Sequence, residues 1–156
     1  MPKTTDPFAP FAKYVREQEK QEGKSLTRKP TAKELARMRA LNLPDSVIQL
    51  FERFAPINGF PHWFPLTRKL KDLLDEYEQD TFGLRTAGFF HFGDTIDGDL
   101  FCFATTATTE PGACTPAVYL LDHEQICGSD TPTPDEIRAA ARRISRDIID
   151  LVRAAA

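Results

Sequence analysis

The chain has 156 residues, of which 41% are hydrophobic and 28% are charged, and its net charge is −3. This length and composition fit one globular domain with a sizeable core and leave little room for a second. No apolar run approaches the ~20 residues that a membrane-spanning helix needs, and the N-terminus lacks the apolar stretch of a secretory signal. The three cysteines lack the spacing of a metal site, so we expect reduced thiols and a cytoplasmic location.

Charge is distributed unevenly along the chain. Residues 1–42 carry ten Lys/Arg against five Asp/Glu, whereas residues 72–130 carry twelve Asp/Glu against Arg85 alone. Such an acidic segment would repel phosphate, which argues against nucleic acid as a partner, and it would attract a basic protein. A solvated surface that only keeps the protein in solution is the alternative interpretation.

The N-terminal part, residues 1–30, is basic and polar. Phe8, Phe11 and Tyr14 have partial helical spacing and predict a short docking helix. Residues 17–30 are nearly all polar and predict a linker or a fraying end.

Three helices are expected between residues 31 and 78. Thr31 and Glu34 form a capping-box pattern at the start of the first. Pro44 suits the first turn of the second, which has a broad apolar stripe and is stopped by Pro56 and Asn58-Gly59. The third has leucines on one side and carboxylates on the other. Those carboxylates are Asp72, Asp75, Glu76 and Glu78.

An aromatic connector broken by proline, residues 60–66, joins the second of these helices to the third. We expect Trp63 to fill the core between two layers. His62 in the same connector has no carboxylate close to it in the sequence, so it is not expected to act as a base.

The pattern changes from helical to strand-like in the middle of the chain. Two aromatic runs, FFHFG and LFCFA, flank Asp97-Gly98, a strong signal for a two-residue hairpin turn. That turn would set Phe92 opposite Phe103 and place four phenylalanines on one face, whereas a longer loop over residues 93–98 would shift the register. The four are Phe90, Phe92, Phe101 and Phe103.

The C-terminal part begins with a predicted surface loop at residues 105–116 and a strand at residues 117–121. Thr133 and Glu136 then predict the capped start of one last helix. Its apolar stripe would comprise Ile137, Ala141, Ile144, Ile148 and Leu151. The order of helices, strands and a final helix predicts a single α+β domain, in which an antiparallel or mixed sheet packs against N-terminal and C-terminal helices.

Asp122, His123 and Glu124 form the most suggestive cluster for a metal site. If they continue the preceding strand, His123 faces away from the two carboxylates, because successive side chains point to opposite faces. A set of three ligands would require the strand to end there. We therefore expect no metal at this position.

Asp94, Asp97 and Asp99 surround a glycine but do not match the spacing of an EF-hand loop, so they are interpreted as turn-forming residues. Cys102 lies in an apolar strand, and His91 is flanked by phenylalanines; both are expected in the core. The sequence holds no GxGxxG, Walker, GxSxG or HExxH motif. We therefore expect no catalytic residue and no cofactor.

Three segments together resemble the SUKH superfamily (Smi-Knr-type proteins). They are LPDSVIQLFERF followed by Asn58-Gly59, GFFHFGDTIDGDLFCF, and AVYLLDHE, in the order that the family shows. The resemblance implies an α+β domain over residues 31–156, preceded by residues 1–30 as an extra extension. The longer loop at residues 105–116 and the lower glycine content around residues 93–98 depart from the family pattern.

The resemblance also implies a role. Many bacterial members are immunity proteins that bind and neutralise a toxin, often a nuclease, and eukaryotic members regulate cell-wall assembly through protein contacts. The expected partner is then a basic toxin domain, with neither nucleic acid nor a membrane bound; the oligomeric state is left open. A housekeeping adaptor of the same fold is the first alternative, and a small metal-assisted enzyme is the second. The positions that match the family's binding region are Asp94, Asp97, Asp99, Asp122 and Glu124.

Overall fold

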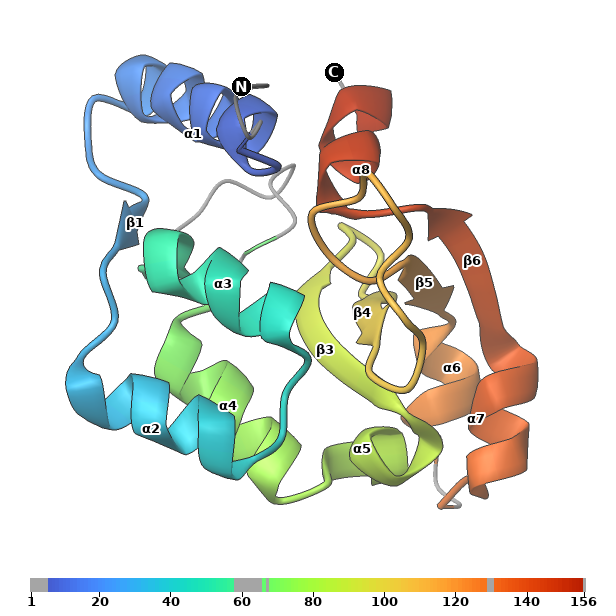
Figure 1. Ribbon diagram of the computed structural model, residues 1–156. Coiled ribbons are helices and arrows are strands. Elements are labelled where there is room, and N and C mark those ends of the chain that lie inside the picture. Colours follow the sequence, from blue (N-terminus) through green and yellow to red (C-terminus); the bar gives the residue numbers. More distant parts are fainter. Residues whose placement is uncertain (1–5, 58–65, 67, 129–130, 156) are drawn as a thin grey trace.

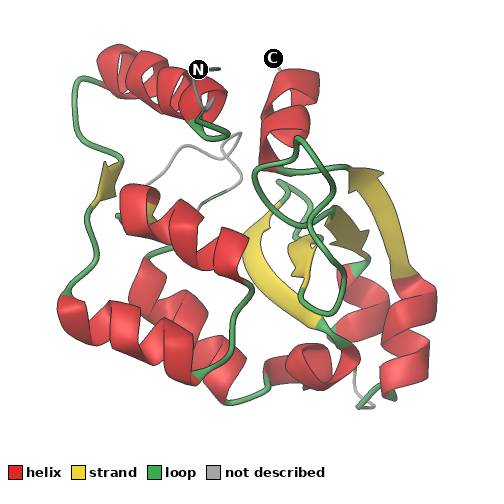
Figure 2. Ribbon diagram, in the orientation of Figure 1, coloured by secondary structure: helices red, strands yellow, loops and turns green. Residues whose placement is uncertain are grey.

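The computed structural model describes residues 6–57, 66, 68–128 and 131–155 (Figure 1). Within these residues the chain forms eight α-helices and two antiparallel sheets, of two and four strands (Figure 2). The predicted α+β class is therefore confirmed, with helices at both ends of the chain. The helices are α1 (Ala9–Glu22), α2 (Ala32–Ala40), α3 (Asp45–Phe54), α4 (Leu70–Glu78), α5 (Leu84–Ala87), α6 (His123–Ile126), α7 (Pro134–Ala140) and α8 (Ile148–Ala155).

The strands of the larger sheet are neighbours in the order in which they follow along the chain. This sheet has the order β3-β4-β5-β6, and the smaller sheet pairs β1 with β2. A short turn joins β3 to β4, whereas α2 and α3 lie between β1 and β2, and α6 and α7 lie between β5 and β6. The strands are β1 (Thr27–Arg28), β2 (Ala55–Pro56), β3 (Phe89–Asp94), β4 (Leu100–Ala104), β5 (Val118–Leu121) and β6 (Ala141–Ser145).

All the helices within the described ranges are short. The longest, α1, has 14 residues, and none of them is long and apolar enough to cross a membrane. Three features predicted from the sequence lie outside the described residues. They are the helix stop at Asn58-Gly59, His62, and Trp63 as a core residue.

The helix α1 belongs to the main hydrophobic core. Its side chains Phe11 and Val15 are buried there, and the Phe11 ring packs edge-on against Phe54 of α3 at 5.1 Å between centroids. Residues 17–22 continue this helix, so their interpretation as a linker is wrong. The helix ends at Gly23, whose φ of 68° is one that glycine adopts without strain.

The segment after α1 is held by backbone contacts. The N–H of Leu26 donates to Oε2 of Glu19 at 2.8 Å, and the Leu26 side chain is buried. Strand β1 then pairs with β2, which follows directly after α3. The polar composition of this segment therefore reflects its outward-facing side chains, while its backbone is ordered by α1 and β2.

The helices α2, α3 and α4 form as predicted. Thr31 accepts the N–H of Glu34, and the Glu34 carboxylate accepts the N–H of Thr31, so the capping box is confirmed. Pro44 stands one residue before α3, as its N-cap. These helices bury the apolar residues that the spacing placed on one face. The buried residues are Met38, Val47, Ile48, Leu50, Phe51, Phe54, Leu70, Leu73 and Leu74.

The four-stranded sheet separates two layers of helices (Figure 1). One face carries Phe90, Phe103 and Val118, which join the core formed by α1 to α4 and α8. The other face carries Cys102 and Leu121, which pack against α5, α6 and α7. Residues opposite each other on neighbouring strands share a face, so alternation along each strand divides the two cores.

The hairpin between β3 and β4 has a different register from the one that a two-residue turn predicts. Phe90, and not Phe92, lies opposite Phe103, and the register shifts between His91 and Gly93. This shift is a β-bulge at Phe92, which inserts one residue into β3. The Phe92 ring still stacks on Phe103 with centroids 4.1 Å apart. The bulge thus explains how four phenylalanines reach one core although the predicted pairing is wrong.

The C-terminal region is not one helix. Thr133 and Glu136 form the predicted capping box of α7, but that helix ends at Ala140 and the chain then extends as β6 along β5. The apolar spacing of four, three, four and three residues is compatible with a helix, but pairing with β5 overrides it. A new helix, α8, begins after Asp147, whose Oδ1 accepts the N–H of Asp150 at 2.9 Å.

The loop at residues 105–116 is only partly a surface loop. Cys114 and Thr115 are buried, and Thr115 Oγ1 accepts the N–H of Ile148 at 3.0 Å. The buried Asp147 carboxylate also accepts the N–H of Cys114 at 3.0 Å. Two hydrogen bonds therefore join the end of the loop to the start of α8.

Replacement of Phe11 by Ala tests whether α1 is part of the domain. Because the Phe11 side chain is fully buried, we expect the free energy of unfolding to fall by about 3–5 kcal/mol in a urea titration. The exposed Arg16 on the same helix provides the matched control, and Arg16→Ala should change stability by about 0.5 kcal/mol or less. Equal effects of the two substitutions would contradict the packing of α1 into the core.

Candidate functional site

The connection between β3 and β4 exposes an apolar side chain among carboxylates. Ile96 is 81% exposed, and Asp97 beside it is also exposed. The backbone of this turn is closed by two hydrogen bonds, from the N–H of Thr95 to the carbonyl of Asp99 at 2.9 Å and from the N–H of Gly98 to the carbonyl of Thr95 at 3.0 Å. The turn is therefore longer than the two residues Asp97-Gly98, and it presents Ile96 on an ordered backbone.

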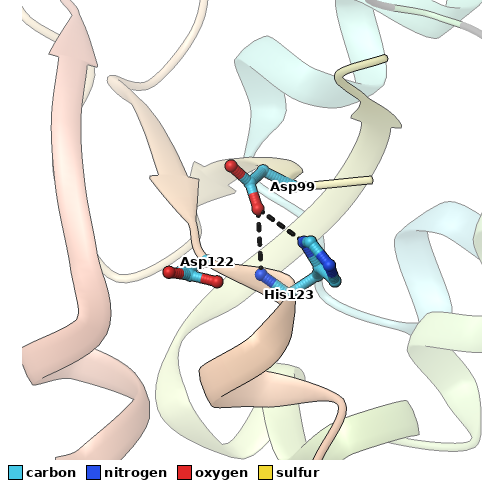
Figure 3. A group of neighbouring side chains, drawn as sticks. All are labelled: Asp99, Asp122 and His123. Atoms are coloured by element: carbon cyan, nitrogen blue, oxygen red, sulfur yellow. Dashed lines mark hydrogen bonds and ion pairs between the residues drawn. The ribbon is translucent and has the colours of Figure 1, made fainter. Parts of the chain in front are cut away.

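The first turn of α6 lies against this connection. Strand β5 ends at Leu121, and Asp122 then caps α6 by accepting the N–H of Glu124 at 2.9 Å. The strand therefore ends where a cluster of ligands would require it to end. The expectation that His123 faces away from Asp122 is wrong for this reason (Figure 3).

Asp99 and His123 join the two segments (Figure 3). One carboxylate oxygen, Oδ1 of Asp99, accepts the backbone N–H of His123 at 3.1 Å and bonds its Nδ1 at 2.8 Å. The hydrogen bond to Asp99 raises the pKa of His123, and the hydrogen bonds from His123 lower the pKa of Asp99. Each partner thus favours the charged form of the other.

The same three side chains have the composition of a metal site. One ligand atom each of Asp99, Asp122 and His123 lies within 4.8 Å of the others. Carboxylate and imidazole ligands suit zinc. However, Asp99 already bonds the imidazole of His123, and Asp122 already accepts the N–H of Glu124 in the first turn of α6. A cation bound through Nδ1 of His123 would have to displace its bond to Asp99, and the three side chains already link β4, β5 and α6 without one.

A second polar cluster is buried between α4 and β3. The side chain of His91 is only 6% exposed, and its two ring nitrogens bond carboxylates on either side. Nδ1 lies 2.8 Å from Oε2 of Glu76, and Nε2 lies 2.7 Å from Oδ1 of Asp94. Nε2 is also 2.9 Å from the carbonyl of Gly93, and Arg68 donates to the other oxygen of Glu76 at 2.9 Å.

This arrangement favours a protonated His91. Burial opposes the charge, but the hydrogen bonds to Asp94 and Glu76 outweigh it and raise the pKa of His91 to about 9. Burial likewise opposes the charge on Glu76, yet the hydrogen bonds from His91 and Arg68 lower its pKa. The cluster is therefore a buried ion network, in which each charge is compensated by a close partner.

The buried cluster does not have the properties of a nucleophilic centre. Cys102 lies opposite His91 in the sheet. Burial and the charges of Glu76 and Asp94 raise the pKa of the Cys102 thiol well above its ordinary value. Both ring nitrogens of His91 are engaged, so neither is available to accept a thiol proton. The prediction that Cys102 and His91 are core residues is confirmed.

Sequence reasoning placed Glu76 on the outward-facing side of its helix, and the structure corrects this. The side chain is 15% exposed and reaches His91 on β3. Arg68 also belongs to this cluster. The only signal in the sequence was a histidine between two phenylalanines in a strand, where a buried imidazole needs polar partners.

The five predicted acidic site residues do not form one uniform surface. Asp94 is directed to the buried His91, Asp99 bonds His123, and Asp122 caps α6. Asp97 and Glu124 are exposed and form no ion pair with any described residue. Of these five residues, the exposed carboxylates of Asp97 and Glu124 thus lie near the β3–β4 turn and the start of α6 without an ion pair, and their role in binding stays a prediction.

Part of the acidic surplus in residues 72–130 is compensated by bases from other parts of the chain. Arg37 of α2 contacts Asp75 at 2.7 Å and Glu78 at 2.9 Å. Arg143 of β6 contacts Glu110 at 2.6 Å. The charge balance of this stretch, counted along the sequence, therefore overstates the negative charge of the surface.

Comparison of the chain with protein-family models, with curated proteins and with solved structures finds no match. The resemblance to the SUKH superfamily therefore rests on the sequence motifs alone and stays a prediction.

The pKa of His91 predicts how stability depends on pH. Because the pKa rises from 6.5 in the unfolded chain to about 9 in the folded protein, protonation stabilises the fold fully below pH 6.5, and this contribution is lost as the pH rises through about 9. The full contribution is about 3 kcal/mol. We expect urea titrations at constant ionic strength to show this loss for the native chain and its absence in His91→Gln.

The comparison with His91→Gln separates the effect of His91 from that of the cysteines. The buried thiols of Cys102 and Cys114 also have raised pKa values, so they too lose stabilising free energy at alkaline pH. They are the same in the native chain and in His91→Gln, so the difference between the two proteins isolates the histidine. Parallel curves for the two proteins from pH 6.5 to about 9 would rule out a charged His91.

A zinc titration tests the cluster of Asp99, Asp122 and His123. Because Nδ1 of His123 is bonded to Asp99 and Asp122 caps α6, we expect no stoichiometric zinc binding by calorimetry at micromolar protein. Native protein that binds one zinc ion, with the binding abolished in His123→Gln, would contradict this interpretation and favour a metal centre.

Proposed function

We propose that this chain is a non-catalytic protein-binding domain, and that it acts as an immunity protein that neutralises a toxin with a basic surface. The single observation that carries the proposal is Ile96, an isoleucine 81% exposed at a hairpin tip. Its neighbour Asp97 and the nearby Glu124 are exposed carboxylates without ion pairs to described residues. An apolar anchor bordered by uncompensated charge is the composition of a recognition surface.

The backbone beneath this surface is well supported. Two backbone hydrogen bonds close the turn, and the Thr95 hydroxyl accepts the N–H of Asp99 at 3.0 Å. Asp99 in turn bonds His123, which fixes the turn against α6. Less conformational freedom is then lost on binding, because the loop is already ordered in the free protein.

The two parts of the surface contribute differently to binding. Exposed carboxylates accelerate the encounter with a basic partner, and rates reach about 10⁸–10⁹ M⁻¹ s⁻¹ at low salt in favourable cases. Tight inhibition also requires an apolar group that becomes buried in the partner, and Ile96 supplies one. Asp94, which faces His91, contributes to the support of this surface more than to the contact itself.

The motifs that resemble the SUKH superfamily favour a toxin as the partner. A housekeeping adaptor would use the same surface, and its partner would be a protein of the same cell that is not toxic. Co-expression with the partner separates the two roles, because only an immunity protein restores growth.

The experiment is affinity capture from the native host with the tagged native chain and with Ile96→Ala. Because Ile96 is exposed, its replacement should leave stability unchanged, whereas the affinity for the captured partner should fall at least about tenfold. Glu52→Gln is the control for a change of charge elsewhere on the surface, because Glu52 is an exposed carboxylate on α3. The affinities are measured by calorimetry with the purified partner.

Two outcomes would count against the proposal. Binding that is equally strong in Ile96→Ala and in the native chain would place the contact elsewhere. Binding that does not change between about 0.05 and about 0.5 M salt would exclude a role for charge in the encounter. Asp97→Asn with Glu124→Gln should reduce this salt dependence while leaving the contact of Ile96 in place.

A further inference from the structure

We propose that β6 is a second binding surface, which accepts an extended acidic segment of another protein as a fifth strand of the sheet. This inference is independent of the surface around Ile96. It rests on an open sheet edge, on the arginines along it and on a pocket beside its first residue.

The edge of the sheet at β6 is open. The strand pairs with β5 on one side, and the N–H of its first residue, Ala141, donates to the carbonyl of Arg138 at the end of α7. For the rest of the strand, none of the described residues hydrogen-bonds to the outer backbone edge. In Figure 1 this strand lies at the right-hand margin of the molecule. Unpaired N–H and C=O groups along such an edge are a template for another strand.

Two consecutive arginines give this edge its charge. Arg142 and Arg143 are both exposed, and Arg142 forms no ion pair with any described residue. The ion pair between Arg143 and Glu110 is itself about half exposed at both side chains, so it can be exchanged for another partner at little cost. Consecutive side chains of a strand leave on opposite faces. A complementary strand therefore needs two adjacent carboxylates, one for each face.

The charge of β6 argues against a second copy of the chain as the occupant. Antiparallel pairing of two β6 strands would bring four arginines into one ladder of five residues, since Arg142 and Arg143 lie near the middle of each strand. Like charges opposite one another destabilise strand pairs. The same repulsion protects the free edge from self-association and leaves it complementary to an acidic strand.

A pocket beside β6 offers a place for an apolar side chain. It has a volume of about 250 Å³, and Ala141, the first residue of β6, forms part of its wall. Phe89 and Tyr119 contribute aromatic rings, and Arg138 contributes a guanidinium. An added strand next to Ala141 would direct alternate side chains to this face of the sheet. A β-branched residue flanking the two carboxylates fits this position.

The test uses the full chain, labelled with nitrogen-15, and the peptide acetyl-TVEEVTV-amide. We expect saturable binding, and at a peptide concentration roughly five times Kd the outward-facing amides of residues 142–145 should exchange roughly sixfold more slowly. The peptide acetyl-TVKKVTV-amide should not bind. Contact with the arginine side chains alone would not protect backbone amides, so binding without this protection would overturn strand addition, as would no binding.

Matched variants test the role of the arginines. Arg142→Glu with Arg143→Glu should weaken binding at least tenfold, whereas Arg16→Glu with Lys20→Glu on α1 changes the net charge equally and should have no effect. Arg142→Glu alone provides a second variant that leaves the ion pair of Arg143 intact. Equal affinity of the β6 and α1 variants would overturn the proposal.

Discussion

The buried ion network of His91 is the interaction on which the rest of the structure depends. Glu76 and Asp94 hold the imidazole from opposite sides, so the network joins α4 to the far end of β3. A charge in this position is costly unless it is compensated, and here each ring nitrogen meets a carboxylate. The position of the β3–β4 hairpin relative to the helices is therefore fixed by directional contacts as well as by apolar packing.

The bulge in β3 follows from the same constraint. His91 must face Glu76, while Phe90 and Phe92 must reach the opposite core. The register shift between His91 and Gly93 then brings the carbonyl of Gly93 and the carboxylate of Asp94 back to the imidazole. The inserted residue thus allows His91 to keep its hydrogen bonds on one face of β3 while the phenylalanine side chains are buried on the other.

Local signals predicted what depends on local contacts. The capping boxes at Thr31 and Thr133 and the apolar stripe of α3 were readable from spacing alone, because a helix satisfies its hydrogen bonds within itself. The break after Ala140 was not, because the competing hydrogen bonds come from β5, which lies about twenty residues earlier in the chain. Similarly, nothing near Glu76 in the sequence indicated His91 as its partner.

The role of the acidic residues in the candidate site also could not be predicted from the sequence, because it depends on contacts with distant residues. The count of acidic residues predicted an acidic surface. In the structure, three of the predicted site residues have structural roles instead: Asp94 bonds His91 below the hairpin, Asp99 links the hairpin to α6, and Asp122 caps that helix. Charge used in this way is compensated and has little attraction left for a partner. What distinguishes the turn is instead Ile96, an apolar side chain whose exposure depends on the loop geometry. In this chain, therefore, several of the carboxylates that the sequence suggested as partner-binding residues stabilise the hairpin and α6, and the exposed Ile96 is the better indication of a binding surface.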